Sequence, residues 1–309
     1  MGLTMRLFPR SRKRRVTVVV GLLGYTLLMT FGGCADMLIL HPTTDRYFVA
    51  GTTRREVPVP GAKPVEVWTM RSPGARSAEP AAYVLEFVGN ASRAEGMADF
   101  VAEEWGHRPV EVWAVNYPGY GGSPGPARLA AIPPAALAAY DALKQRAGGK
   151  PIFVSGQSLG TTAALHVAAN RPVAGAVLWS PPPLRDMILK RFGWWNLWLL
   201  AGPVAIQVPG QLDSLRNARK VTAPAVFVAT GNDTVVPLSY QAKVSDGYAG
   251  EKRFIRLPDS EHNALLEGPS VGEYQAALDW LWERSVAGEG NERQDAKDAK
   301  GERQEENRE

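Results

Sequence analysis

Six short apolar segments recur along the chain, and helical patterns lie between them. The segments are rich in Val, Phe, Ile and Trp and are bounded by Gly, Pro or Asn, which is typical of buried strands. Strands that alternate with helices are joined by crossover connections, so they run parallel in one sheet with helices on both faces. The sequence therefore predicts a doubly wound α/β fold with a mostly parallel sheet. The predicted strands are residues 81–89, 110–116, 151–156, 174–180, 225–231 and 253–258.

Two earlier extended stretches, residues 54–60 and 65–71, follow each other too closely for a crossover helix. Parallel strands need a long connection, so these two are expected to pair antiparallel at the N-terminal edge of the sheet. The clearest helices are predicted from apolar spacing, from Pro at the start of a segment and from Gly-Gly at its end. They are residues 133–149, 159–170 and 272–286.

The N-terminus has the layout of a targeting segment. Residues 1–15 hold six Arg or Lys and no acid, and an apolar run from Val16 to Phe31 follows directly. A basic region followed by an apolar one is typical of a secretory signal. The only cysteine, Cys34, comes after two glycines. This arrangement resembles a bacterial lipobox, in which the signal is cleaved before a cysteine that then carries lipid.

Phe31 and Gly32 differ from the residues that are usual in a lipobox, so two alternatives stay open. One is an uncleaved anchor over residues 16–40, which is nearly long enough to span a bilayer. The other is cleavage without lipid. Each of the three predicts an exported or membrane-associated protein. Residues 1–33 are therefore interpreted as a signal peptide or anchor, and residues 34–286 as the folded domain.

Of the net charge of +4, the two ends of the chain together contribute +3. Residues 287–309 hold eight acids and five bases, so the body, residues 16–286, has a net charge of only +1. A near-neutral body has no basic face for phosphates, so nucleic-acid binding is not expected. The stretch 287–309 has no aromatic or β-branched residue, which predicts a disordered tail. One cysteine, four scattered histidines and no glycine-rich phosphate-binding motif indicate neither a metal nor a cofactor.

The pattern G-x-S-x-G, typical of a nucleophilic serine on a strand–turn–helix elbow, occurs twice, at Ser123 and Ser158. At such an elbow the residue after the serine donates its backbone N–H to a developing oxyanion. Pro124 follows Ser123 and has no N–H, so Ser123 is interpreted as part of a Gly/Pro-rich turn. Ser158 lies between a predicted strand and a predicted helix, and Leu159 can donate. Ser158 is therefore the candidate nucleophile, with a helix-capping serine as the alternative.

A serine hydroxyl needs a positioned base, and the chain has four histidines. His41 lies beside the signal segment, His107 lies before a strand, and His166 lies within the helix after the candidate serine. His262 follows the last predicted strand, at the sheet edge where open α/β folds place their ligands. His262 is therefore the candidate base.

The carboxylate that orients such a base comes between the serine and the histidine in chain order. Asp233 directly follows the strand 225–231, and Asp186 follows the preceding strand. Asp233 is favoured by its position along the sheet, with Asp186 as the alternative. Asp259 and Glu261 lie too close to His262 in sequence to reach its ring easily.

Five motifs in this order resemble those of the α/β-hydrolase superfamily, over roughly residues 40–286. The similarity is greatest to its compact, membrane-associated serine hydrolases, of the serine aminopeptidase-like and acyl-protein thioesterase-like branches. The resemblance implies that the N–H groups of Asn90 and Leu159 form the oxyanion hole. Val88 stands where the family usually has His, and Pro118 replaces a frequent Arg. The motifs are FVGNASRAEG (87–96), NYPGYGGSPG (116–125), GQSLG (156–160), TGNDTVVP (230–237) and DSEHN (259–263).

These residues predict acyl transfer to water through an acyl-enzyme on Ser158. The segment 182–210 is rich in Trp and Leu and follows the strand after which family cap elements arise. An apolar cap would favour a small-molecule acyl ester or a lipid as substrate; a helix packed on the sheet and a lipid-facing surface are the alternatives. Peptidase, thioesterase or amidase activity stays open. So does a membrane-tethered binding module without turnover, which Val88 favours.

Overall fold

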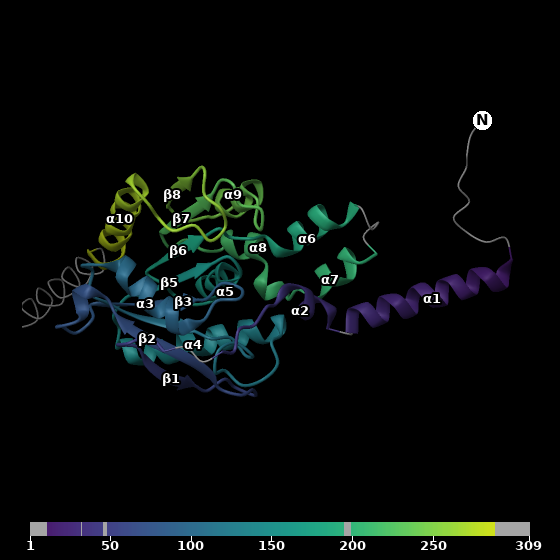
Figure 1. Ribbon diagram of the computed structural model, residues 1–309, viewed down its shortest axis with the longest axis horizontal. Coiled ribbons are helices and arrows are strands. Elements are labelled where there is room, and N and C mark those ends of the chain that lie inside the picture. Colours follow the sequence, from purple (N-terminus) through teal and green to yellow (C-terminus); the bar gives the residue numbers. More distant parts are fainter. Residues whose placement is uncertain (1–10, 32, 46–47, 195–198, 288–309) are drawn as a thin grey trace, which may run out of the picture.

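The computed structural model describes residues 11–31, 33–45, 48–194 and 199–287 (Figure 1). Its centre is an eight-stranded sheet in the order β1-β2-β4-β3-β5-β6-β7-β8. β1 pairs antiparallel with β2, and β2 with β4, whereas the other neighbours are parallel. The doubly wound fold with antiparallel strands at the N-terminal edge is confirmed. The strands are β1 Thr53–Val57, β2 Val65–Arg71, β3 Ala82–Phe87, β4 Val110–Val115, β5 Ile152–Gln157, β6 Gly175–Trp179, β7 Ala225–Thr230 and β8 Lys252–Leu257.

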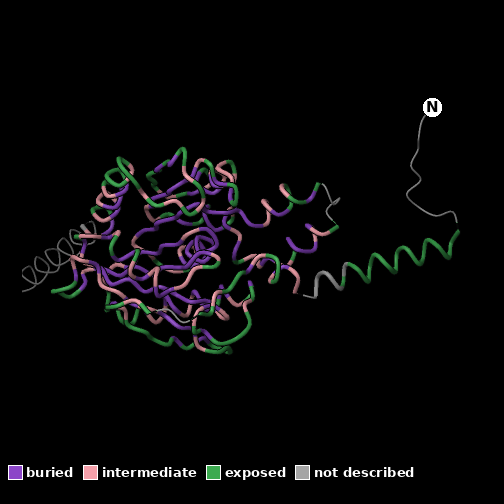
Figure 2. The backbone as a smooth tube through the Cα atoms, viewed as in Figure 1, coloured by how far each residue is buried: buried purple, intermediate pink, exposed green. Residues whose placement is uncertain are grey.

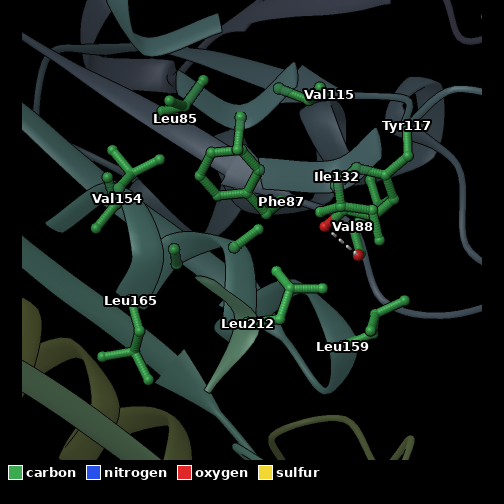
Figure 3. Packing of buried hydrophobic residues seen from close by; sticks show 14 of the residues in the cluster. Leu85, Phe87, Val88, Val115, Tyr117, Ile132, Val154, Leu159, Leu165 and Leu212 are labelled. Atoms are coloured by element: carbon green, nitrogen blue, oxygen red, sulfur yellow. Dashed lines mark hydrogen bonds between the residues drawn. The ribbon is translucent and has the colours of Figure 1, made fainter. Parts of the chain in front are cut away.

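Helices cover both faces of the sheet. Alternate residues of a strand point to opposite faces, and in the central strands both sets of side chains are mostly apolar and buried. On one face, Leu85 and Phe87 of β3 pack in the cluster that includes residues of α4 and α5 (Figure 3). On the other face, Val84 packs with residues of α3 and α10. The helices of the body are α3 Ala94–Trp105, α4 Ile132–Ala147, α5 Leu159–Ala168, α8 Ser214–Ala218, α9 Leu238–Asp246 and α10 Pro269–Trp282. Short helical turns cover Pro73–Ala75, Leu129–Ala131, Gly210–Leu212 and Glu283–Ala287.

One predicted strand differs from expectation. The last strand was expected to be buried, but in β8 only Ile255 and Leu257 are buried, and Phe254 is 45% exposed. β8 lies at the end of the sheet, and within the described part of the chain it pairs with β7 alone. An edge strand of this kind keeps one side open to solvent, and strand order, not local composition, decides which strand that is.

The N-terminal helix α1, Arg12–Phe31, projects away from the body (Figure 1), and its side chains from Arg12 to Tyr25 are exposed (Figure 2). No helix in the described ranges is both long and apolar enough to cross a membrane. The signal, anchor and lipid assignments stay predictions. The predicted tail lies outside the described residues from position 288 onward, as do residues 1–10.

The chain joins the body at α2, Cys34–Ile39, which packs against α7. Ala35 is buried, and the Asp36 carboxylate accepts a hydrogen bond of 2.8 Å from the backbone N–H of Leu129. Gln207 of α7 donates from Nε2 to the Cys34 Sγ at 3.2 Å. Residues from Cys34 onward are therefore held by contacts with the folded body.

The predicted cap segment 182–210 contains α6, Leu184–Phe192, and α7, Ala201–Gln207. The two helices pack against each other, and α7 also contacts α1 and α2 (Figure 1). Arg191 at the end of α6 donates hydrogen bonds to the carbonyls of Thr234 and Val235 at 2.6 and 2.9 Å. This ties α6 to the loop that follows β7.

Candidate active site

Ser158 lies on the turn between β5 and α5, in a strained backbone conformation with φ 51° and ψ −118°. Non-glycine residues seldom adopt a positive φ, and such strain is concentrated at functional sites. The two glycines of its motif permit the turn. A Cβ on Gly160 would overlap the Phe87 carbonyl oxygen, and one on Gly156 would press against Gly160. Only glycine therefore lets the start of α5 approach the end of β3.

The side chain of Ser158 makes no capping hydrogen bond to α5, although the residue stands at the N-cap position. The alternative of a helix-capping serine is therefore wrong. Its backbone is held instead: its N–H donates to the Trp179 carbonyl at 2.8 Å, and its carbonyl accepts from the Thr161 N–H at 3.0 Å. The strained turn is thus fixed by bonds that leave the hydroxyl uncommitted to the helix.

Ser123 has a different environment. Its Oγ donates to the Asn116 carbonyl at 2.7 Å and accepts from the Glu66 N–H at 2.8 Å. The residue is buried in the turn after β4, where its backbone also bonds to Gly119 and Tyr120. The hydroxyl joins the turn to β2, which confirms the interpretation of Ser123 as a structural residue.

Asp233 and His262 lie in the loops that follow β7 and β8, and the structure brings them together. The distance from His262 Nδ1 to Asp233 Oδ2 is 2.6 Å. The two loops are joined by a 3.0 Å hydrogen bond from the Asn232 N–H to the Ser260 carbonyl. A Cβ on Gly231 would overlap the Pro258 carbonyl oxygen, so glycine is needed for this approach.

The Asp233 side chain has no exposed surface and accepts hydrogen bonds at both oxygens. Oδ1 accepts the N–H groups of Val235 and Val236, at 2.8 and 2.7 Å. Oδ2 accepts from Thr230 Oγ1 at 2.8 Å and from Gln241 Nε2 at 3.1 Å, besides His262. Burial alone would raise the pKa of this carboxyl. The hydrogen bonds from His262, Val236 and Thr230 outweigh burial and hold the pKa below its usual range.

Thr230 and Gln241 were not found by sequence reasoning. Thr230 ends β7, and Gln241 lies in α9, where it is buried. Gln241 Nε2 also contacts Thr230 and the Val236 carbonyl, so it holds the loop as well as the carboxylate. Their spacing from Asp233, three residues before and eight after, has no recognisable pattern.

Asp186, the alternative to Asp233, is paired elsewhere. Its carboxylate lies 2.7 Å from Lys190 Nζ and 2.6 Å from Lys243 Nζ, in an ion-paired group between α6 and α9. Of the two aspartates, only Asp233 contacts His262.

Among the described residues, none of the other three histidines is hydrogen-bonded to Ser158 or Asp233. His166 is buried in α5, its Nδ1 is 3.2 Å from Asn170 Nδ2, and burial lowers its pKa. His107 is exposed, with Nε2 at 3.4 Å from Asp279. His41 donates its backbone N–H to the side chain of Asn90.

Asn90 and Leu159 lie at the ends of β3 and β5. Asn90 is anchored through its side chain: Nδ2 donates to the Ile39 carbonyl at 2.6 Å, and Oδ1 accepts from Tyr120 Oη at 2.8 Å. Leu159 is the first residue of α5, so its N–H has no partner within the helix. Val88 is buried near Leu159, and its carbonyl accepts a 3.1 Å hydrogen bond from Tyr117 (Figure 3). The residue that replaces His is thus a core residue of this loop.

No hydrogen bond joins Ser158 to His262 among the described residues. Contacts between a nucleophile and its base are often long without substrate and tighten in the reacting complex. Of the three predicted catalytic residues, Asp233 and His262 are thus joined by a direct hydrogen bond, and Ser158 lies on the turn at the end of β5.

A family model described as "Alpha/beta hydrolase family" matches residues 38–214, which is more than half of the chain. The chain belongs to the alpha/beta hydrolase family. This confirms the superfamily expected from the motifs, and membership supports hydrolase activity.

Relatives in sequence include an uncharacterized protein of Mycobacterium tuberculosis, 28% identical over 179 residues, or 56% of this chain. Protein ABHD12B of Homo sapiens is 25% identical over 184 residues, or 51% of this chain. The chain spans 60% of the length of the mycobacterial protein and 49% of that of the human one.

Solved structures share the fold. Est1E from Butyrivibrio proteoclasticus with ferulic acid bound matches with a TM-score of 0.60 and 17% identity, over 75% of this chain and 99% of that one. The Pyrococcus furiosus esterase Pf2001 matches with a TM-score of 0.58 and 16% identity, over 80% and 98%. A puromycin-hydrolyzing peptidase of Mycobacterium tuberculosis matches with a TM-score of 0.59 and 18% identity, over 76% and 39%.

Proposed function

We propose that this protein is a serine hydrolase that cleaves carboxylic esters of small molecules. In this mechanism Ser158 attacks the ester carbonyl, His262 takes the hydroxyl proton, and Asp233 holds the imidazole ring. The alcohol leaves with the proton from His262, and water then hydrolyses the acyl-enzyme by the same route.

The contact between Asp233 and His262 carries this proposal. The buried Asp233 carboxylate lies 2.6 Å from His262 Nδ1 and accepts the proton that this nitrogen carries. The other ring nitrogen, Nε2, is then unprotonated and free to accept the proton of the serine hydroxyl. Because the pKa of Asp233 is lowered, the carboxylate is charged near neutral pH and stabilises the imidazolium that forms.

The backbone N–H groups of Asn90 and Leu159 are proposed to bind the oxyanion. Backbone donors need no particular side chain, so the change to Val88 leaves them in place. Anchoring of the Asn90 side chain to Ile39 and Tyr120 supports a preformed site, which is the property that makes such donors effective.

A small-molecule ester is favoured by the surroundings of His262. A cavity of about 570 Å³ lies there; its lining, from the loops after β7 and β8 and the start of α10, includes His262 but not Ser158. This volume lies in the range of small-molecule sites. Est1E, which shares the fold, has been solved with the small molecule ferulic acid bound. Peptidase activity is the second candidate, because peptidases are also among the structures that share the fold.

We further propose that the protein is exported and held at a membrane through its N-terminus, with Cys34 as the lipid-bearing residue. The basic and apolar order of residues 1–31 supports this. Metabolic labelling with an alkyne fatty acid is expected to mark the wild-type protein and to leave Cys34→Ser unlabelled. Equal labelling of both would contradict the lipid site.

Ester turnover tests the proposed function. The full chain is assayed with p-nitrophenyl esters from acetate to dodecanoate, and with a matched amide and thioester. We expect ester turnover that falls by at least about a thousandfold in Ser158→Ala. A folded wild-type protein that turns over none of these substrates would favour the non-catalytic binding module instead.

A further inference from the structure

A second cavity, of about 240 Å³, opens beside the candidate active site on the face of the sheet that α3 covers. Its walls are mostly apolar and include Met97 and Phe100 of α3 and Trp179 of β6. Its rim includes Gln157 and Asn263, the direct neighbours of Ser158 and His262 in sequence. A group bound here therefore lies close to the residues proposed to react.

The carboxyl group of Glu86 lines this cavity from β3. Glu86 is only 1% exposed, and its Oε2 has no hydrogen-bond partner among the described residues. Ser155, its neighbour in register on β5, contacts the carboxyl group but leaves this oxygen unsatisfied. A buried polar atom without a partner is costly, and native structures contain few of them.

A second carboxyl group, from Glu104 of α3, lines the same cavity. Its Oε2 accepts a hydrogen bond of 3.2 Å from Tyr274 Oη. In the described part of the chain neither Glu86 nor Glu104 pairs with a lysine or an arginine. Burial raises the pKa of each carboxyl to about 8, and the neighbouring Glu86 contributes to the shift of Glu104. The cavity thus presents two carboxyl groups that are mostly protonated at neutral pH, and no lysine, arginine or histidine is among the described residues that line it.

An ammonium group on a short apolar body complements these features. Its N–H donors would satisfy the free oxygen of Glu86, its charge would match the ionised acid, and its carbon atoms would contact Phe100 and Trp179. We propose that this cavity is a specificity pocket that binds a primary amine carried by the substrate. The proposal rests on the proposed hydrolase function for its role in catalysis, but binding itself does not require turnover.

The volume limits the size of the amine. An apolar cavity of about 150 Å³ is enough for benzene, so one of about 240 Å³ suits a benzylamine-sized group. Benzylamine is therefore the probe, and benzyl alcohol is its neutral control of nearly the same shape.

Calorimetric titration of the full-chain protein with each probe tests the pocket. We expect saturable binding of benzylamine, weaker binding of benzyl alcohol, and a loss of benzylamine affinity of about tenfold or more in Glu86→Gln. Glu103→Gln changes an exposed carboxylate on the same helix, paired with Arg76, and is expected to bind benzylamine like the wild type. Glu104→Gln provides a second cavity variant if Glu86→Gln does not fold.

The pH dependence has a defined direction. Among the described residues, Glu86 and Glu104 are the titratable groups that line the cavity; Tyr274 donates a hydrogen bond to Glu104, and Tyr117 interacts electrostatically with Glu86. A carboxyl must lose its proton to pair with the ammonium, so benzylamine affinity should rise between pH 6 and about 8. Benzyl alcohol affinity should stay constant over the same range.

The proposed amine pocket would be refuted if benzylamine does not bind, or if it binds no more tightly than benzyl alcohol. It would also be refuted if Glu86→Gln and Glu104→Gln both keep the wild-type affinity for benzylamine. Ester turnover without benzylamine binding would remove the pocket and leave the hydrolase. Benzylamine binding that depends on Glu86 in a protein without ester turnover would leave the pocket and remove the proposed function.

Discussion

At the scale of single residues, the Asp233 carboxylate accepts hydrogen bonds from five donors, and one of them is the His262 ring. This fixes both the charge of the carboxylate and the direction of the ring. The Asp186 carboxylate is instead paired with two lysines and, among the described residues, has no hydrogen bond or ion pair with His262.

Asp233→Asn is expected to lower kcat for ester turnover by about three to four orders of magnitude, because the amide no longer orients the imidazole or stabilises its charge. KM should change little. Asp186→Asn serves as the matched control and should keep wild-type kcat. Steady-state kinetics at pH 7 measure both, and similar losses in the two variants would contradict the assignment.

Ser123→Ala is expected to weaken folding without abolishing turnover. The change removes a hydroxyl that bonds to both Asn116 and Glu66, which should lower the free energy of unfolding by about 1–3 kcal/mol. Urea unfolding measures the loss, and ester assays well below the melting temperature should give near-normal kcat. A catalytic loss as large as that of Ser158→Ala would contradict the structural role.

Glu86 is expected to make the free energy of unfolding depend on pH. A carboxyl whose pKa is raised from 4.5 to about 8 binds more protons in the folded than in the unfolded state between those values. Stability should therefore fall as pH rises through this window. Glu86→Gln should flatten this dependence in urea unfolding between pH 5 and about 8. An unchanged slope would show that Glu86 is not buried as described.

At the scale of elements, close approaches of backbone place the candidate residues. Gly160 lets α5 meet β3, and Gly231 lets the loops after β7 and β8 meet. At both positions the backbone of the facing segment is so close that the methyl group of an alanine would overlap it.

Gly160→Ala is expected to destabilise the fold severely, by more than about 4 kcal/mol, because its Cβ would collide with the Phe87 carbonyl, which is backbone and cannot move aside. Gly272→Ala in α10 is the matched control, since its Cβ would meet nothing within 4 Å. Alanine should be neutral or stabilising there, by up to about 1 kcal/mol. Thermal melting of both variants decides the matter, and a stable Gly160→Ala protein would refute the close contact.

Elements with local signals were predictable, whereas contacts between distant segments were not. The strand before Ser158 and the helix after it could be predicted because their signals lie in adjacent residues. Ser123 could be excluded as the nucleophile for the same reason, since Pro124 follows it directly. Gln241 holds Asp233 only because α9 packs against β7, and the bond from Thr230 depends on how the chain turns after β7. Glu86 lies in a strand that was predicted to be buried, but the cavity that it lines could not be predicted because residues of α3 form part of its wall. The exposure of β8 depends on its place at the sheet edge.

At the scale of the whole molecule, the N-terminal segment divides into two parts with different roles. α1 projects from the body, whereas residues 34–41 are built into it. Ala35 and Leu40 are core residues, and the backbone of Ile39 and His41 holds the Asn90 side chain.

Two truncations test this division. Removal of residues 1–33 should leave ester turnover within about threefold of wild type, since the described side chains of α1 are mostly exposed and lie away from the site. Removal of residues 1–41 should lower both the melting temperature and kcat, because the anchor of the Asn90 loop is lost. Equal activity of the two shortened proteins would show that α2 does not support the site.

An activated serine is the central claim, and covalent labelling tests it most directly. The full-chain protein is treated with a fluorophosphonate, which bonds to nucleophilic serines, and is weighed by intact mass, with Ser158→Ala and Ser123→Ala alongside. We predict one adduct on the wild type and on Ser123→Ala, and none on Ser158→Ala. A folded wild-type protein without an adduct, or an adduct that persists in Ser158→Ala, would contradict the assignment of Ser158 as the nucleophile.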